Sequence, residues 1–207
     1  AKDRMRMNNR PRTEFDALGL ELVARGRTTD AYLEVITNSW VHEPLLGDVA
    51  TVPVRIGGPV PIWVGGASMA AIRRAARFGE VWHPINPEFG WLRDIGIPAL
   101  HAAAAQESKA VPQLVPRIKA RLLTESATAG RPLGLGTPDQ IADDVAALAG
   151  LGAVEVILDP NPDSPRPRDF CEEQRLLLDV KKAYEHLDAA CGGHRRAGKT
   201  NHEVRSK

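Results

Sequence analysis

The sequence predicts an α/β protein with a parallel sheet. Three observations lead to this class: short apolar runs rich in Val, Ile and Trp recur along the chain, helical segments separate them, and Gly or Pro marks most junctions. Strands that alternate with helices form parallel sheets, because each right-handed crossover returns the chain beside the previous strand. The pattern contains four strand–helix units. A closed (β/α)8 barrel needs eight, so the sheet is either a small open one or the back half of a larger fold.

Hydrophobic periodicity and apolar runs place the individual elements. Residues 27–41 come first and form a helix, because their apolar residues recur at helical spacing. Each of the four strands is a short apolar run that a helix follows, as in buried parallel sheets. The expected strands are 61–66, 80–85, 114–123 and 154–159, and the helices that follow them are 69–78, 91–108, 138–150 and 168–190.

Capping residues fix the ends of two of these helices. Ser68 is the expected N-cap of the first helix after a strand, and Gly79 ends that helix. Thr137 is the N-cap of the helix at 138–150, with Pro138 at its first position and Gln140 completing a capping box. The first residue of each helix is therefore predicted, and the second helix is expected to end within residues 150–152.

Glycine and proline interrupt two other elements. Gly96 and Pro98 are expected to break the first part of the helix at 91–108, because proline removes a backbone donor and glycine disfavours helix. Pro116 lies inside the third strand, although central strands exclude proline. The residue at which the third strand begins is therefore not predicted.

Charge divides the chain into a body and two tails. Residues 1–12 contain five basic residues and one acidic residue, and residues 192–207 contain the same numbers, although the net charge of the whole chain is only +1. We expect basic tails at 1–12 and 191–207, the second one disordered, around one domain at 13–190. A nucleic-acid-binding protein concentrates basic charge on a folded face, so no nucleic-acid partner is expected.

Composition excludes several further classes. The two cysteines, Cys171 and Cys191, lie outside any Cys-x-x-Cys motif, which excludes a disulfide framework or a zinc ribbon. The histidines show no metal-ligand spacing and no Gly-x-Ser-x-Gly motif occurs, so we expect neither a metal site nor a serine nucleophile. No apolar stretch approaches the roughly 18 residues of a membrane helix. Residues 1–12 contain five basic residues and no apolar run, so no secretory signal is expected. A cytoplasmic protein without a membrane partner is expected.

The first candidate site is the turn formed by Gly65, Gly66, Ala67 and Ser68. Here a strand ends in two glycines and a helix begins at a serine. Glycines allow a ligand to approach the backbone closely, and the N–H groups of a first helical turn attract anions. A phosphate can therefore rest on this turn. The alternative is a tight strand-to-helix turn with an ordinary serine cap, because the full G-x-G-x-x-G motif is absent.

The second candidate site lies at the carboxyl ends of the later strands, where ligands bind in parallel α/β folds. Trp82 and His83 end the second strand and can flank a planar ring. The alternative is a core tryptophan beside a surface histidine. Asp159 ends the fourth strand and either contacts a ligand or begins a turn, and Arg121 either meets an anionic cofactor or pairs with an acid.

Several motifs, taken in order, resemble the bacterial luciferase-like family, and in particular its oxidoreductases that use the deazaflavin coenzyme F420. The resemblance covers roughly residues 13–190. It is carried by Glu14-Phe-Asp-Ala-Leu-Gly19, Arg25-Gly-Arg-x-x-Asp30-x-Tyr-Leu-Glu-Val-Ile36 with Trp40, Pro61-Ile-Trp-Val-Gly-Gly66-x-Ser68-x-x-Ala71, Arg74-Ala-Ala-Arg-x-Gly79-x-x-Trp82-x-Pro84 and Gly136-Thr-Pro-x-Gln-Ile141.

The resemblance implies a (β/α)8 TIM barrel of which the chain holds the C-terminal half, strands five to eight. It implies a hydride transfer between F420 and an organic substrate, with the cofactor phosphate at Ala67 and Ser68 and the ring near Trp82 and His83. The alternatives are an FMN-dependent monooxygenase of the same family and a non-catalytic half-barrel. The residues Met7-Asn-Asn-Arg10 depart from the family, which carries the Gly-rich end of the fourth strand there. No catalytic residue is assigned, because the strands that would supply one are absent.

A half-barrel predicts self-association. Cutting four strands from a barrel leaves two open edges and exposes side chains that would fill the interior. A homodimer that covers this surface is expected. The alternative is that residues 14–49 fold across the open side. The side chains expected to be exposed include parts of Ile62, Val64, Val81, Ile118, Val156 and Leu158.

Overall fold

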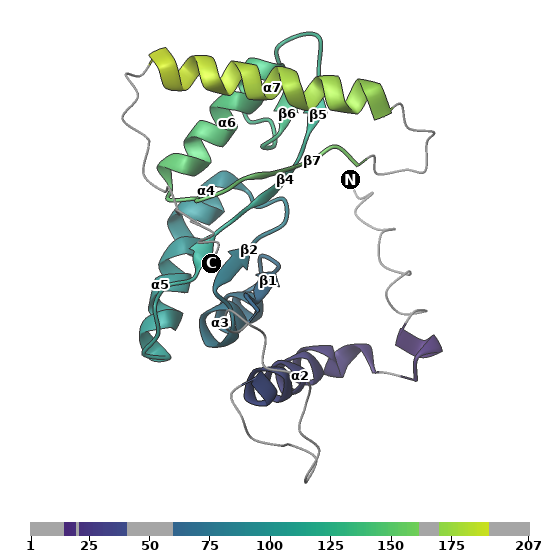
Figure 1. The fold of residues 1–207 in the computed structure, drawn as a ribbon, viewed down its shortest axis with the longest axis vertical. Helices are drawn as coiled ribbons and strands as arrows, with labels where there is room; N and C mark the ends of the chain where they lie inside the picture. The colour runs from purple at the N-terminus through teal and green to yellow at the C-terminus, as the bar shows by residue number, and fades with distance from the viewer. Residues whose placement is uncertain (1–14, 20, 41–59, 162–169, 191–207) are drawn as a thin grey trace, which may run out of the picture. The chain divides into compact units, whose positions relative to one another are not determined.

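A computed structural model describes residues 15–19, 21–40, 60–161 and 170–190 (Figure 1). The tails expected at 1–12 and 191–207 lie outside these residues. So does the segment at 7–10, which differs from the family pattern. The chain divides into two compact units, Ala1–Pro61 and Ile62–Lys207.

The first unit contains one long helix. A 3-10 turn, η1 (Leu22–Ala24), leads into α2 (Arg25–Trp40), so the helix expected at 27–41 is confirmed within two residues. Two hydroxyl groups hold its first turns, because Thr28 Oγ1 donates to the carbonyl of Ala24 and Thr29 Oγ1 donates to that of Arg25.

The second unit contains the sheet, and all of its strand pairs are parallel. Within the described residues the strands form one three-stranded sheet, β1-β2-β3, and two pairs, β4-β7 and β5-β6. A bridge between Ile85 and Arg117 continues the order from β2 to β4. The predicted parallel α/β fold is confirmed, and the barrel is not closed among the described residues. The strands are β1 (Trp63–Gly65), β2 (Val81–His83), β3 (Gln113–Leu114), β4 (Arg117–Lys119), β5 (Arg121–Leu122), β6 (Leu135–Gly136) and β7 (Ile157–Asp159).

The third predicted strand is divided into β3, β4 and β5. Pro116 carries no N–H and separates β3 from β4. Ala120 separates β4 from β5, because its N–H donates to the carbonyl of Asp159 while the N–H of Arg121 donates to that of Gly134. This one segment therefore pairs with three different strands: β2, β7 and β6. The sequence analysis did not predict β6, which consists of two residues.

The helices of the second unit begin and end close to the predicted residues. Ser68 Oγ accepts a hydrogen bond from the N–H of Ala71 and so caps the first of them, and both bonds of the Thr137–Gln140 capping box are present. The bounds are α3 (Met69–Phe78), α4 (Phe89–Trp91), the π-helical segment η2 (Leu92–Gly96), α5 (Ile97–Gln106), α6 (Pro138–Gly150) and α7 (Phe170–Ala190).

The irregularity expected near Gly96 and Pro98 is present, but it is a π-helical segment and not a break in the chain of helical turns. The chain continues from α4 through η2 into α5, and the N–H of Ile97 donates to the carbonyl of Leu92, five residues earlier. Such a π turn absorbs a misfit within a helix. Pro98 is the second residue of α5 and follows directly on this π turn.

Gly96 serves close packing. A Cβ atom at this position would lie 2.9 Å from the ring of Trp82 and 2.9 Å from the ring of Trp91. Only glycine leaves room for both rings, which meet edge to face with centroids 6.3 Å apart.

The core lies between one face of the sheet and α3 and α5 (Figure 1). Val64, Trp82 and Leu114 are in register across β1, β2 and β3 and face these helices. They pack against buried residues that include Ile72, Ala75, Ala76, Leu100 and Ala104.

The exposure expected of the barrel-interior side chains is largely wrong. Val64, Val81 and Ile118 are buried, at 6%, 4% and 0% exposed. The remaining three (Ile62, Val156 and Leu158) are partly buried against the core. Successive strand residues alternate between the two faces of a sheet, and Val64 and Ile118 face the helices. The homodimer stays a prediction, which light scattering on the purified protein tests.

Candidate functional site

The turn that follows β1 has the geometry of a close backbone approach. Gly66 has φ +104, and its N–H donates to the carbonyl of His83 at 3.2 Å. A Cβ atom there would lie 3.2 Å from the Cβ of Ala71. Gly66 is therefore required both by its backbone conformation and by the space above α3.

Ser68 caps α3 at the exposed end of this turn. Its Oγ accepts from the N–H of Ala71 at 3.2 Å, which satisfies one of the unpaired donors of the first turn. Ala67, Ser68, Met69 and Ala70 are all exposed. Because the hydroxyl accepts this bond through a lone pair, its own hydrogen remains able to donate. The cap is thus shown, and it leaves the turn accessible to an anion.

Trp82 supports the turn from the core side of the sheet. Its indole is fully buried, packs edge-on against Trp91, and donates from Nε1 to the carbonyl of Gly66 at 2.9 Å. In the structure the indole presents no surface to a ligand. The side chain therefore fixes the position of the glycine turn.

His83 lies on the opposite face of the sheet, beside Trp63. Its Nδ1 is 2.7 Å from the carbonyl oxygen of Val115. A carbonyl only accepts, so Nδ1 carries the hydrogen and the Nε2 of a neutral imidazole is an acceptor. The rings of Trp63 and His83 are tilted by 54° with centroids 5.8 Å apart, and Trp63 is 46% exposed. Trp63 was not predicted as a site residue, because a strand of three residues shows too little alternation to reveal which of its side chains face away from the core.

Three charged residues end β4 and β7 on this same open face. Arg117 pairs with Ile157 and Lys119 with Asp159 across the two strands. An Nη2 nitrogen of Arg117 lies 2.8 Å from Oδ2 of Asp159, and Nζ of Lys119 lies 4.0 Å from that oxygen. Asp159 is 6% exposed. Its Oδ1 accepts the backbone N–H of Asn161, two residues further on, at 3.0 Å, which confirms the turn expected as one of the two alternatives for Asp159.

The neighbours of Asp159 hold its carboxylate in the charged form. Burial alone would raise the pKa of Asp159. The backbone N–H and side-chain amide of Asn161 donate to Oδ1, and Arg117 adds a hydrogen bond and a positive charge. Together these interactions hold the pKa of Asp159 below its usual value.

This shift predicts acid-dependent stability. We expect Asp159→Asn to lower the free energy of unfolding at neutral pH by about 1–3 kcal/mol, because charge-assisted hydrogen bonds are lost. The loss is complete above the unfolded pKa, about 3.9, and disappears as the pH falls through the lowered folded value. Urea unfolding of both proteins from pH 7 to 3 measures it, with the exposed Asp143→Asn as control. A difference between them that does not vary with pH contradicts the prediction.

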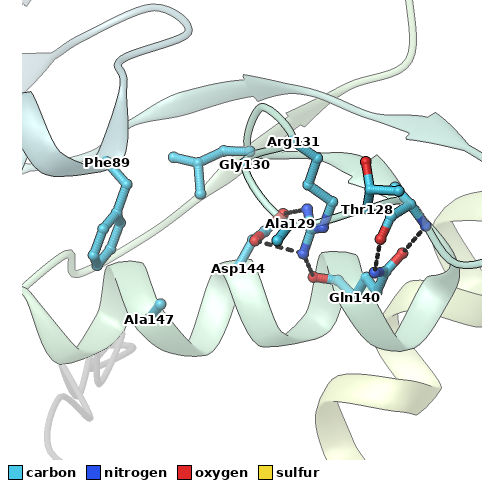
Figure 2. Close-up of a pocket in the computed structure, with 10 residues that line it drawn as sticks. Phe89, Thr128, Ala129, Gly130, Arg131, Gln140, Asp144 and Ala147 are labelled. Carbon is cyan, nitrogen blue, oxygen red and sulfur yellow. Dashed lines mark hydrogen bonds and ion pairs between the residues drawn. The ribbon is translucent and has the colours of Figure 1, made fainter.

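A pocket of about 400 Å³ lies elsewhere, between α6 and the loop that precedes it (Figure 2). The guanidinium of Arg131 bonds to both carboxylate oxygens of Asp144, at 2.6 and 2.9 Å, and to the carbonyls of Leu135 and Gln140. Phe89 and Ala147 line the apolar end. None of the predicted site residues lines this pocket, and its polar contacts fasten the loop to α6.

No group of three or more His, Cys, Asp or Glu side chains in the described ranges is placed to hold a metal ion. No helix in the same part of the chain is long and apolar enough to cross a membrane.

Several solved structures have a similar fold. An F420-dependent secondary alcohol dehydrogenase, determined with an F420-acetone adduct, matches with TM-score 0.60 and 11% identity over 79% of this chain and 63% of that one. The monooxygenase RslO1 from Streptomyces bottropensis matches with TM-score 0.58 and 16% identity over 86% and 65%. The structure of apo-MsnO8 matches with TM-score 0.54 and 14% identity over 80% and 61%. The chain spans less than two thirds of each protein, and at these identities the likeness concerns the fold.

The family is identified from the amino-acid sequence. Comparison with curated proteins gives no match. The sequence profile described as luciferase-like monooxygenase matches residues 9–118, which is more than half of the chain. The matched range includes the glycine turn, His83 and Arg117. The chain therefore belongs to the luciferase-like monooxygenase family.

Proposed function

We propose that the chain is part of an oxidoreductase that transfers a hydride between coenzyme F420 and a small organic substrate. The observation that carries the proposal is the exposed Gly65–Ser68 turn, which opens α3 at the carboxyl end of β1. The family of the chain and the fold it shares with an F420-dependent dehydrogenase support the choice of cofactor class.

The residues around the turn fit a phosphate and a planar ring. The first-turn N–H groups and the Ser68 hydroxyl suit the phosphate, because a helix N-terminus carries unpaired donors and partial positive charge. His83 and the half-exposed Trp63 suit the ring, which would lie against the open face of the sheet. Trp82 acts on both sites as a positioning residue, through the carbonyl of Gly66.

A bound deazaflavin supplies the hydride chemistry, and the protein positions it. In this chain the Nδ1 bond to Val115 fixes the orientation of the His83 imidazole. Its Nε2 is then available to accept a hydrogen bond from the ring or the substrate.

The alternative cofactor is FMN, with a monooxygenase reaction. The favouring observation is the fold shared with RslO1, whose description is that of a monooxygenase. The phosphate turn serves either cofactor. A non-catalytic half-barrel is the third candidate, and the open sheet face favours it.

Spectroscopic titration distinguishes the F420-dependent oxidoreductase, the FMN-dependent monooxygenase and the non-catalytic half-barrel. The purified chain is titrated with F420 and with FMN, and the absorbance and fluorescence of each cofactor report binding. Saturable binding of F420 supports the proposal, and binding of FMN alone supports the monooxygenase. Binding of neither cofactor overturns both.

Ser68→Asp tests the phosphate assignment. Aspartate is also a good N-cap, so α3 keeps its cap. If the turn holds the phosphate, the added carboxylate repels it and cofactor affinity falls by more than about tenfold, since charge-assisted bonds contribute about 1.5–3 kcal/mol. The control Ser126→Asp adds the same charge at an exposed loop position. Equal affinity in Ser68→Asp and Ser126→Asp would remove the assignment.

A further inference from the structure

The pocket beside α6 is built from chain that follows two strands at their carboxyl ends (Figure 2). Phe89 comes after β2, and the loop at 127–133 comes after β5. In parallel α/β folds ligands bind at the carboxyl ends of the strands. The volume of the pocket, about 400 Å³, is in the range of small-molecule sites. Its position and size therefore both fit a ligand.

The loop that forms one wall of the pocket is fixed near both of its ends. The side chain of Gln140 accepts the N–H of Ala127 at 2.9 Å and donates to the carbonyl of Ala127 at 3.0 Å. Asp144 bonds to Arg131 through both carboxylate oxygens and accepts the N–H of Gly134 at 2.8 Å. The wall is thus formed before any ligand arrives, and a preformed site loses less entropy on binding.

The charges in the pocket wall balance each other. Among the described residues that line the pocket, only Arg131 and Asp144 are charged, and both side chains are largely buried. They pair at 2.6 and 2.9 Å through two parallel hydrogen bonds. An ionic ligand would lose its hydration here without meeting an unpaired counter-charge, which is costly. The pocket therefore favours an uncharged molecule.

Two donors in the wall make no hydrogen bond within the described part of the chain. They are the hydroxyl of Thr128, which is exposed, and Nε of Arg131, whose Nη1 and Nη2 are both bonded. Most of the acceptors are already used, because Gln140 Oε1 and Asp144 Oδ2 accept two bonds each. A hydroxyl and an N–H can both donate to one ligand oxygen. The polar end of the pocket thus suits a carbonyl oxygen.

The opposite end of the pocket is apolar. Figure 2 shows Phe89 and Ala147 at this end, away from Thr128 and Arg131. Phe89 is half-buried and Ala147 is exposed. A hydrocarbon group placed against them would cover apolar surface that is now in contact with water, and this favours binding.

We propose that this pocket binds an uncharged carbonyl compound with a hydrocarbon group. The carbonyl oxygen accepts from Thr128 and from Nε of Arg131, and the hydrocarbon group lies against Phe89 and Ala147. Asp144 is a positioning residue, because it holds Arg131 and the loop. The site goes beyond the proposed function, since it uses neither the glycine turn nor the open face of the sheet.

Equilibrium dialysis with three benzene derivatives of similar shape tests the ligand class. Acetophenone carries the carbonyl, isopropylbenzene replaces its oxygen by a methyl group, and benzoate carries a negative charge. We expect saturable binding of acetophenone that is tighter than the binding of benzoate. Absence of saturable acetophenone binding, or binding of benzoate that is equally tight or tighter, overturns the proposal.

Ala147→Trp tests whether acetophenone binds in this pocket. The added indole fills the apolar end, so we expect the affinity for acetophenone to fall by more than about tenfold. Ala102→Trp is the matched control, because it adds the same side chain at an exposed position of α5. Equal affinity in Ala147→Trp and Ala102→Trp overturns the proposal.

Thr128→Val tests the hydrogen bond, and it reports on the pocket should Ala147→Trp fail to fold. We expect a loss of about two- to tenfold for acetophenone, the size of one neutral hydrogen bond, and no loss for isopropylbenzene. Thr124→Val, also at an exposed position, is the control. An equal change for the two ligands in Thr128→Val, or no change for either, overturns the assignment of the carbonyl.

Two measurements separate the pocket from the proposed function. If Trp63→Ala loses acetophenone affinity while Ala147→Trp keeps it, the ligand binds on the open face of the sheet and the proposal is overturned. We expect the affinity for F420 to be the same in Ala147→Trp and in the unmodified chain, and a tenfold loss would assign the pocket to the cofactor instead. If neither cofactor binds while acetophenone binds in the pocket, the proposed function fails and the pocket stands.

Discussion

Replacing Trp82 with alanine is expected to destabilise the protein by about 3–5 kcal/mol, the range for large aromatic side chains removed from a core. The indole is fully buried and contacts the ring of Trp91. Its removal leaves a cavity above Gly96 and frees the carbonyl of Gly66 from its only side-chain donor in the described structure. Urea unfolding monitored by circular dichroism measures the loss.

Trp63→Ala is the matched control, because the same side chain is removed from the neighbouring strand. Trp63 is 46% exposed on the other face of the sheet. Its replacement is expected to cost less than about 1 kcal/mol, as at other partly exposed positions. If Trp63 contacts the cofactor ring as proposed, the main effect of Trp63→Ala is weaker cofactor binding. Equal destabilisation by the two variants would contradict the assignment of the two faces.

Gly134→Ala is expected to destabilise the protein by about 3 kcal/mol or more, through backbone strain together with lost hydrogen bonds. Gly134 has φ +80, and a Cβ atom there would meet the carbonyl oxygen of Lys119 at 2.2 Å. The loop must move to relieve this contact. That movement breaks the bond from Gly134 N–H to Asp144 and the bond from Arg121 N–H to the Gly134 carbonyl.

Gly130→Ala is the matched control, and the difference between it and Gly134→Ala measures the steric part of the destabilisation. Gly130 has nearly the same conformation, φ +82, and a Cβ atom there would meet nothing within 4 Å. We expect it to cost about 1–2 kcal/mol, the left-handed strain alone. Thermal and urea unfolding compare the variants. Equal losses would show that the close approach of Gly134 to β4 does not contribute.

Local chemistry explains how much of the fold the sequence predicts. The ends of α3 and α6 follow from Ser68 and from the Thr137–Gln140 box, because a cap acts within one turn of the chain. Gly96 is needed because the rings of Trp82 and Trp91 pack against it. Trp82 lies on a strand distant in sequence, so local sequence patterns could not predict this contact. The division of the third strand likewise depends on three partners far along the chain.

The candidate site shows the same limit. The glycine turn could be predicted because its residues are consecutive. The roles of Trp63 and Trp82 depend on which face of the sheet each one occupies, and three-residue strands give too little alternation to decide. Arg117, Lys119 and Asp159 meet only through the register of β4 with β7, so the sequence offers the residues and not their contact.

The three partners of the segment Gln113–Leu122 also have a kinetic consequence. Loop-closure entropy grows with the length of chain between paired residues. Arg121 pairs with Leu135 across a short loop, whereas Gln113 pairs with Val81 and Arg117 with Ile157 across whole helical crossovers. The β5–β6 pair is therefore the least costly of the three to nucleate, and slower pairings then set the folding rate. Of the three pairings, β4 with β7 joins residues that are farthest apart in the chain, so we expect the contact between Arg117 and Asp159 to form last.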